Sequence, residues 1–411
     1  MAAPVLLALP GLMTLHFPAA DGANTTADRA AALRGTTTNP LASDAGAAAW
    51  ATVLPDPSTP TAGGPNGAAQ PKLPSSSAGA NGVVATPDPG SVGQPTPAPR
   101  PAATPAPTPR PTPKPTPKPL PPPPPPASGP LTLGVWSGQP WQPGSLDALK
   151  SMLGRNPRLF LTYVGWNRPF YCSDEQQIAN RGASHVLTWE PTGFTLKGIA
   201  SGSADTFIRA WAKGAKACGI RIYLRPMHEM NGDWYPWGRG VNGNTPTDFV
   251  KAWRHMHDLF VAAGATNVKW VWSPNVRYGS NYPLADLYPG SGYVDWLALD
   301  GYNWGLDPHL GQPSWQSFGQ IFGATYAEIT RLAPGKPMMV AETASTENGG
   351  NKAQWILKTF LYDAPKYPVI RALIWFNQAD GASNFKINSS AASLAAFKQV
   401  LNSPTFSGRL P

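Results

Sequence analysis

Eight short apolar runs follow one another between residues 131 and 411, separated by stretches with helical periodicity. In the stretch 247–263, Phe249, Trp253, Met256 and Phe260 recur at the spacing of one helix face. Such alternation predicts a parallel sheet, and eight strands in about 280 residues predict a (β/α)8 TIM barrel of the α/β class. The expected strands are 131–136, 158–164, 185–189, 220–225, 268–272, 296–300, 338–341 and 372–376, and the clearest helices are 204–217, 247–263, 315–332, 352–361 and 393–401.

A doubly wound nucleotide-binding fold is the rival architecture for this alternation. That fold needs a glycine-rich turn after its first strand. Here the turn is Ser137-Gly-Gln-Pro-Trp141, which has one glycine and one proline. The turn therefore favours the barrel.

The first 130 residues differ sharply from the rest of the chain. They hold 31 of the 50 prolines and one of the 16 tryptophans, Trp50. A segment so poor in large apolar side chains cannot bury enough surface to offset its conformational entropy. We therefore expect three parts: a signal-like segment 1–20, a disordered Ala/Thr/Pro-rich region with a polyproline linker at 21–130, and a catalytic barrel at 131–411.

The first 20 residues indicate where in or outside the cell the protein acts. Residues 2–13 are mostly apolar, and the small residues up to Ala20 could precede a cleavage point, although a basic n-region is missing. We expect an exported protein, secreted or associated with the cell surface or wall; the alternative is an apolar disordered end. The Pro-rich stretch 85–126 is either a stiff polyproline II spacer or plain disorder.

Charge and hydropathy exclude two classes of partner. The net charge is +9, but outside the tail the basic residues are scattered, so no nucleic-acid footprint is expected. No run of 18 apolar residues exists, so no transmembrane helix is expected. We expect a monomer.

In a barrel, functional groups lie at the carboxyl ends of the strands. Carboxylates and tryptophans dominate those positions here, and there is no serine elbow, phosphate loop or Cys-His pair. Indole faces stack on sugar rings, and paired carboxylates hydrolyse glycosides. Glu229 and Glu342 follow the fourth and seventh strands, across the barrel mouth from each other, so their side chains can converge on one glycosidic bond.

The segment Leu-Arg-Pro-Met-His-Glu-Met-Asn-Gly-Asp-Trp-Tyr-Pro-Trp-Gly (224–238) resembles the acid/base motif of glycoside hydrolase family 26. Later blocks, including Trp-Ser-Pro-Asn (272–275), Asp-Gly-Tyr-Asn (300–303) and Ala-Glu (341–342), resemble the same family in the same order. The resemblance covers about residues 131–405. It implies a retaining, endo-acting barrel enzyme that hydrolyses β-1,4-mannan by double displacement and needs no cofactor.

The resemblance also implies residue roles. Glu229 matches the general acid/base, Glu342 the nucleophile, and His228 the residue beside the acid/base. Tyr302 matches a hydrogen-bond donor to the nucleophile, and Arg225 the basic residue below it. The full expected substrate-binding set is His228, Arg225, Trp234, Trp237, Tyr302, Trp304, Trp375, Asn275, Trp189 and Glu190. Trp375 would be the platform beneath the sugar at the cleaved bond.

One departure from the family pattern concerns specificity. Many mannanases of the family read Trp-Phe-Trp-Trp-Gly where this chain reads Trp-Tyr-Pro-Trp-Gly (234–238). This departure keeps open a mixed-linkage β-1,3-1,4-glucanase of the same family as an alternative to mannanase. A non-catalytic polysaccharide-binding or assembly barrel is a separate alternative, and the presence of both glutamates argues against it.

Several other residues are expected to be structural. His255 and His257 lie two apart on a helix and face different sides, so no metal site is expected. Asp300 is expected to hold a loop, and Asn303 is undecided. Cys172 follows the second strand and Cys218 precedes the fourth, at opposite ends of the barrel, so we do not expect them to form a disulfide.

Overall fold

A computed structural model describes residues 122–123, 126–127, 129–276, 282–307, 314–380 and 383–411. Eight parallel strands close into one barrel in chain order, β1 to β8, with β8 paired back to β1. The strands are β1 (Thr132–Trp136), β2 (Leu159–Gly165), β3 (Ser184–Glu190), β4 (Ile222–Pro226), β5 (Val268–Trp272), β6 (Trp296–Asp300), β7 (Met338–Thr343) and β8 (Ile370–Phe376). Each overlaps the strand predicted from the sequence, which confirms the (β/α)8 barrel.

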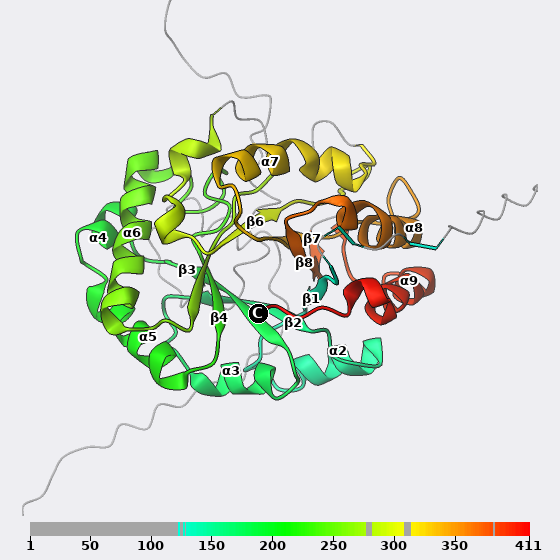
Figure 1. Ribbon diagram of the computed structural model, residues 1–411, viewed down its shortest axis with the longest axis horizontal. Helices are drawn as coiled ribbons and strands as arrows, with labels where there is room; N and C mark the ends of the chain where they lie inside the picture. Colours follow the sequence, from blue (N-terminus) through cyan, green and yellow to red (C-terminus); the bar gives the residue numbers. More distant parts are fainter. Residues whose placement is uncertain (1–121, 124–125, 128, 277–281, 308–313, 381–382) are drawn as a thin grey trace, which may run out of the picture. The chain divides into compact units, whose positions relative to one another are not determined.

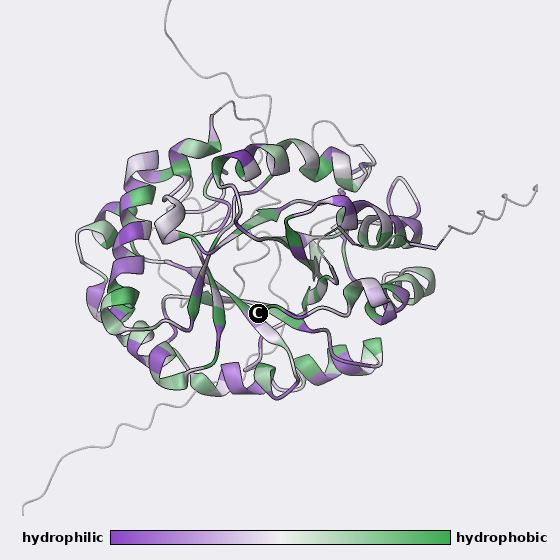
Figure 2. Cartoon of the chain, in the orientation of Figure 1, coloured by the Kyte–Doolittle hydropathy of each residue, from purple (hydrophilic) through white to green (hydrophobic). Residues whose placement is uncertain are grey.

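Helices surround the barrel (Figure 1). The five predicted helices correspond to α5 (Asp205–Cys218), α6 (Pro246–Ala263), α7 (Phe318–Leu332), α8 (Lys352–Lys358) and α9 (Ala391–Asn402). Three further helices lie in gaps where the sequence predicts helical patterns without bounds: α2 (Ser145–Leu153), α3 (Cys172–Ala179) and α4 (Leu196–Ala200). Apolar and polar residues alternate along these helices (Figure 2), as expected for a layer between a sheet and water.

Helix α6 illustrates how the sequence specifies this layer. Thr245 and Asp248 form a capping box at its start, Pro246 occupies the first helical position, and Gly264 ends it with a φ of 75°. Phe249 and Trp253 are among its buried residues, as are Met256 and Phe260. The predicted apolar face is therefore the face that packs on the barrel.

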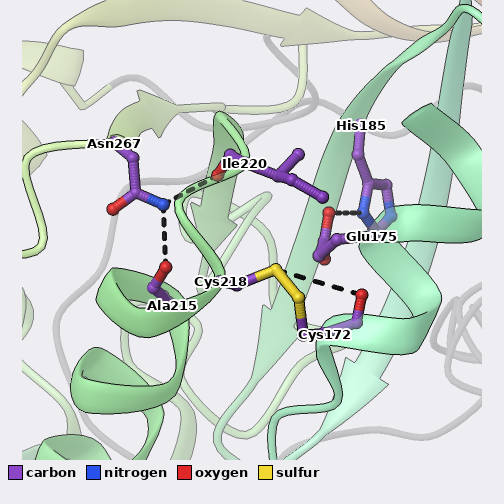
Figure 3. The surroundings of a disulfide bond; sticks show 7 residues. All are labelled: Cys172, Glu175, His185, Ala215, Cys218, Ile220 and Asn267. Carbon is purple, nitrogen blue, oxygen red and sulfur yellow. Dashed lines mark hydrogen bonds and ion pairs between the residues drawn. A yellow bond between two sulfur atoms is a disulfide. The ribbon is translucent and has the colours of Figure 1, made fainter.

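The structure corrects the expectation for the two cysteines. Cys172 and Cys218 form a disulfide with their Cα atoms 5.4 Å apart (Figure 3). The loop after β2 does not stay at the barrel mouth: Trp211 of α5 donates to the carbonyl of Arg168 at 3.1 Å, and Phe170 packs against α5. The loop therefore descends along α5 before α3 begins, which brings Cys172 to the end of α5.

The domain boundary at residue 131 stays a prediction. The expectations for residues 1–20 and for 21–121 lie outside the described residues. Among the helices that are described, none is long and apolar enough to cross a membrane.

Candidate active site

The turn that follows β4 carries backbone strain. Met227 and Glu229 have φ angles of 47° and 52°, values that cost a side-chain-bearing residue roughly 1–3 kcal/mol. Neighbouring strands hold the turn on both sides. The Met227 N–H donates to the Trp189 carbonyl at 3.2 Å, and the Glu229 N–H donates to the Ser273 carbonyl at 2.7 Å. This hydrogen bonding fixes the backbone of Glu229 at the end of the barrel.

Glu229 is buried and receives one hydrogen bond on each carboxyl oxygen. The Asn275 side-chain amide donates to Oε1 at 2.6 Å, and the Trp234 indole donates to Oε2 at 2.8 Å. Burial, and next the charge of Glu342, raise the pKa of Glu229 to about 8, although both donors act in the opposite direction. Glu229 is therefore suited to carry a proton at neutral pH.

Glu342, in β7, has different partners. The Arg225 guanidinium donates to Oε1 and the Tyr302 hydroxyl donates to Oε2. His228 Nε2 lies 4.0 Å from Oε1. A cation and a hydroxyl aimed at the two oxygens stabilise a carboxylate. The two glutamates thus occupy environments that suit them to opposite roles.

Arg225 connects the lower part of the site. Its side chain is fully buried, and Nη1 donates to both oxygens of Asp300 at 2.9 Å. Nε donates to Thr188 Oγ1 at 2.9 Å, and Ser273 Oγ donates to Asp300 at 2.8 Å. Burial alone would lower the pKa of Arg225, but Asp300 and Glu342 raise it well above its usual value. Arg225 therefore stays charged beside Glu342.

His228 is held in a neutral state beside this network. Burial, and next the charge of Arg225, lower its pKa well below the usual value. Its Nε2 and the Tyr235 hydroxyl are 3.0 Å apart, and the Trp237 indole donates to its carbonyl at 2.7 Å. The rings of Tyr235 and Trp237 stack at 4.5 Å. Both rings pack against the His228 ring.

Glu190, at the end of β3, is a third buried carboxyl. Burial raises its pKa to about 7, against the influence of Arg225. Within the described part of the chain, Glu190 Oε1 and His228 Nδ1 have no hydrogen-bond partner. Buried polar atoms without partners are uncommon in proteins, so both are suited to form hydrogen bonds with a bound ligand.

The structure brings most of the predicted site residues together. Glu229, Asn275 and Trp234 form one hydrogen-bonded group, and Glu342, Arg225 and Tyr302 form the other. His228 lies beside Glu342, and the Trp237 indole donates a hydrogen bond to the His228 carbonyl. Trp304 lies next to Tyr302, with the ring centroids 5.5 Å apart.

Two predicted substrate-binding tryptophans lie outside this group. Trp375 is fully buried, its indole donates to the Phe385 carbonyl at 2.8 Å, and its ring packs against Phe360 and Phe397. Trp189 is fully buried against Trp211 of α5 and Phe260 of α6. Side chains alternate along a strand, so these two face the helix layer.

Sequence reasoning missed residues that support the site. Thr188 and Ser273 hold the Arg225–Asp300 pair, and Asp300, the last residue of β6, is the buried partner of Arg225 and also accepts the Val276 N–H of the loop after β5. Phe376, beside Trp375, faces the other way and contacts Trp136 and Tyr302. The alternation of side chains along β8 could have shown that Trp375 and Phe376 face opposite sides. It could not show which of the two faces the barrel interior, because that depends on how the strand pairs with its neighbours.

A closed barrel with buried glutamates after β4 and in β7, each with its own hydrogen-bond partners, is an arrangement typical of barrel glycoside hydrolases. Residues 199–363 match the sequence profile of glycosyl hydrolase family 26.

Two curated relatives show how the likeness is distributed. Endoglucanase H of Acetivibrio thermocellus is 36% identical over 276 residues, which is 66% of this chain and 30% of that protein. A mannan endo-1,4-beta-mannosidase of Bacillus subtilis is 33% identical over 196 residues, which is 44% of this chain and 46% of that protein. The chain thus spans less than half the length of either relative.

Solved structures share the fold. A modular endo-beta-1,4-mannanase from Cellulomonas fimi aligns with a TM-score of 0.53 at 19% identity, covering 69% of this chain and 75% of that one. The catalytic domain of an endo-beta-1,4-mannanase from Bacillus sp. JAMB-750 aligns with a TM-score of 0.52 at 20% identity, covering 67% of this chain and 86% of that one. At this identity the likeness bears on the barrel alone. No group of three or more metal-ligating side chains occurs among the residues that the structure describes.

Proposed function

We propose that this chain is a retaining endo-β-glycosidase that hydrolyses β-1,4-mannan. The observation that carries the proposal is the contrast between its two glutamates. Glu229 is buried, with a pKa raised to about 8, whereas Glu342 receives hydrogen bonds from a guanidinium and a hydroxyl. A protonated and an ionised carboxyl are what double displacement requires.

In the first step, an oxygen of Glu342 attacks the anomeric carbon and the bond to the leaving oxygen breaks. Glu229 gives its proton to that oxygen, and a glycosyl ester on Glu342 forms. In the second step Glu229, now ionised, takes a proton from water as the water attacks the anomeric carbon. The ester bond breaks and Glu342 is released as a carboxylate beside Arg225.

Substrate binding uses the polar atoms without protein partners and the aromatic side chains near the glutamates. Glu190 Oε1 and His228 Nδ1 are the groups that we assign to sugar hydroxyls. Trp234 and Trp304 are half-buried and supply apolar faces to sugar rings. No cofactor takes part in this chemistry.

Mannan is supported as the polymer by the relatives named mannan endo-1,4-beta-mannosidase. A second candidate polymer, a mixed-linkage β-1,3-1,4-glucan, is favoured by two observations. The relative aligned over 276 residues is named Endoglucanase H. In addition, Tyr235-Pro236 replaces the Phe-Trp of many family mannanases, and the Tyr235 hydroxyl contacts His228.

We further propose that the protein is exported and acts as a monomer. The Cys172–Cys218 disulfide supports export, because such bonds persist in oxidising compartments. All of the proposed catalytic groups come from one chain.

The test is release of reducing sugar by the full chain from glucomannan, galactomannan, barley mixed-linkage glucan and β-1,3-xylan. We expect release from galactomannan. Glu229→Gln should lower the rate by about 10²–10⁴-fold. Release from barley glucan alone would transfer the assignment to the second candidate. A folded chain inactive on every polymer, or a Glu229→Gln variant as fast as the wild type, would contradict the proposal.

A further inference from the structure

Glu229 is held by two donors that themselves need support. Asn275 lies in the loop after β5, and Trp234 lies five residues beyond Glu229 in the turn after β4. Either side chain could rotate away unless something fixes its position. Two residues between Glu229 and Trp234, Asn231 and Gly232, contact these donors directly.

Asn231 clamps the backbone of Asn275. Its side-chain amide nitrogen donates to the Asn275 carbonyl at 2.9 Å, and its side-chain oxygen accepts from the Asn275 N–H at 2.9 Å. The pair of bonds imitates the pairing of two strands where β4 has already ended. With both backbone groups of Asn275 held, its side chain is directed at Glu229 Oε1.

Gly232 provides the space in which Trp234 lies. A Cβ atom on Gly232 would be 2.4 Å from Cζ2 of the Trp234 indole and 2.5 Å from two further ring carbons. Any side chain at this position would therefore push the indole away. With glycine there, the ring rests against the turn and its N–H reaches Glu229 Oε2.

From these contacts we infer that Asn231 and Gly232 are positioning residues for the reaction, each seating one of the two donors to Glu229. The inference rests on the proposed role of Glu229 as acid/base. It gives a physical reason for the last two letters of the His-Glu-Met-Asn-Gly segment, and neither residue touches the reacting atoms in this arrangement.

The inference predicts a specific change in pH dependence. Both donors stabilise the ionised form of Glu229 and so lower its pKa. Loss of either donor should raise that pKa, and the alkaline limb of the rate profile should then move to higher pH. A residue that only supported the fold would lower activity without moving this limb.

The first experiment compares Asn231→Ala, Asn275→Ala and the double variant in the full chain, using kcat against pH on whichever polymer the wild type cleaves. We expect Asn231→Ala to lower kcat by about 10- to 100-fold and to move the alkaline limb upward. Because both substitutions act through one hydrogen bond, their effects should not add in the double variant.

Asn267 offers a matched control. Like Asn231, it makes two hydrogen bonds to the backbone: its side-chain amide nitrogen donates to the carbonyls of Ala215 and Ile220 at 2.9 and 2.7 Å (Figure 3). It does so beside the Cys172–Cys218 disulfide, at the start of β4 rather than at its end. Asn267→Ala should lower the resistance to urea and leave the alkaline limb unchanged.

The second arm uses Gly232→Ala, which should displace Trp234 and move the limb in the same direction. Its control is Gly350→Ala, since a Cβ there would also meet an indole, 2.4 Å from Cε2 of Trp315. If Asn231→Ala fails to fold by circular dichroism, Asn231→Ser is the milder replacement.

The inference would be overturned if Asn231→Ala and Gly232→Ala lowered kcat but kept the wild-type limb, or if the effects of Asn231→Ala and Asn275→Ala were additive. A wild-type chain inactive on every polymer would instead refute the proposed function, so the two failures are distinguishable.

Discussion

Replacing Arg225 by methionine tests the electrostatic framework beneath the two glutamates. Arg225 is fully buried and bonded to both oxygens of Asp300 and to Glu342. Methionine has a similar length and no charge, so the substitution leaves two buried carboxylates without their cation. Removing one partner of a buried ion pair costs about 3–5 kcal/mol. At roughly 2–4 °C per kcal/mol, the melting temperature should fall by about 6–20 °C.

The assay is urea unfolding of the full chain, monitored by tryptophan fluorescence. Asp300→Asn, added to Arg225→Met, removes one of the stranded charges and should recover about 1 kcal/mol or more. Arg209→Met is the control. Arg209 is half-exposed and pairs with Asp205 at 3.2 Å, so its loss should cost no more than about 0.5 kcal/mol.

Either of two results would refute the reasoning about Arg225. One is a loss of less than about 1 kcal/mol for Arg225→Met, which would mean that the carboxylates do not need the cation. The other is an Asp300→Asn change that recovers nothing in the Arg225→Met background.

Glu229, Tyr302 and the Cys172–Cys218 disulfide each carry a further prediction. The rate should fall as pH rises through about 8, because Glu229 must be protonated to act as an acid and burial raises its pKa to about 8; a limb near pH 5 would contradict this assignment. Tyr302→Phe should lower kcat by about 10- to 100-fold, since a hydrogen bond to a charged group contributes about 1.5–3 kcal/mol, and an unchanged kcat would count against Tyr302 as a partner of Glu342. Replacing Cys172 and Cys218 by serine should reduce the free energy of unfolding by about 4 kcal/mol for a closed loop of 46 residues, and a loss below about 1 kcal/mol in urea would argue against that estimate.

The fold was largely predictable from the sequence because both periodicities are strong. The strands at 268–272 and 296–300 were predicted at their observed bounds, and the helix at 247–263 began one residue late. Helices α2, α3 and α4 lie in gaps for which the sequence predicted helical patterns without bounds. Helix α3 spans eight residues and contains few apolar positions, so its period carries little signal.

The candidate site was predictable for residues whose position follows from lying at the end of a particular strand. Glu229 follows β4 and Glu342 is the next-to-last residue of β7, and the carboxyl ends of all strands of a barrel meet at one face. The direction of a side chain was harder, as Trp375 and Phe376 show. One faces the helices and the other faces Tyr302, and a shift of one residue exchanges them.

The disulfide could not be predicted, because it depends on the path of a loop. A loop that stayed at the barrel mouth would have kept Cys172 far from Cys218. The packing of Phe170 and the bond from Trp211 to Arg168 draw the loop down along α5. Such tertiary contacts have no local signature in the sequence.

The most direct test of the central claim is to trap the covalent intermediate. The full chain is incubated with 2-deoxy-2-fluoro-β-mannosyl and 2-deoxy-2-fluoro-β-cellobiosyl fluorides, and the labelled peptide is identified by mass spectrometry. Fluorine at the second carbon slows both steps, and the fluoride leaving group lets the ester accumulate. We predict one label, on Glu342, and none on Glu229. A label on Glu190, or turnover by the wild type with inversion of the anomeric centre, would contradict the assignment of Glu342 as nucleophile.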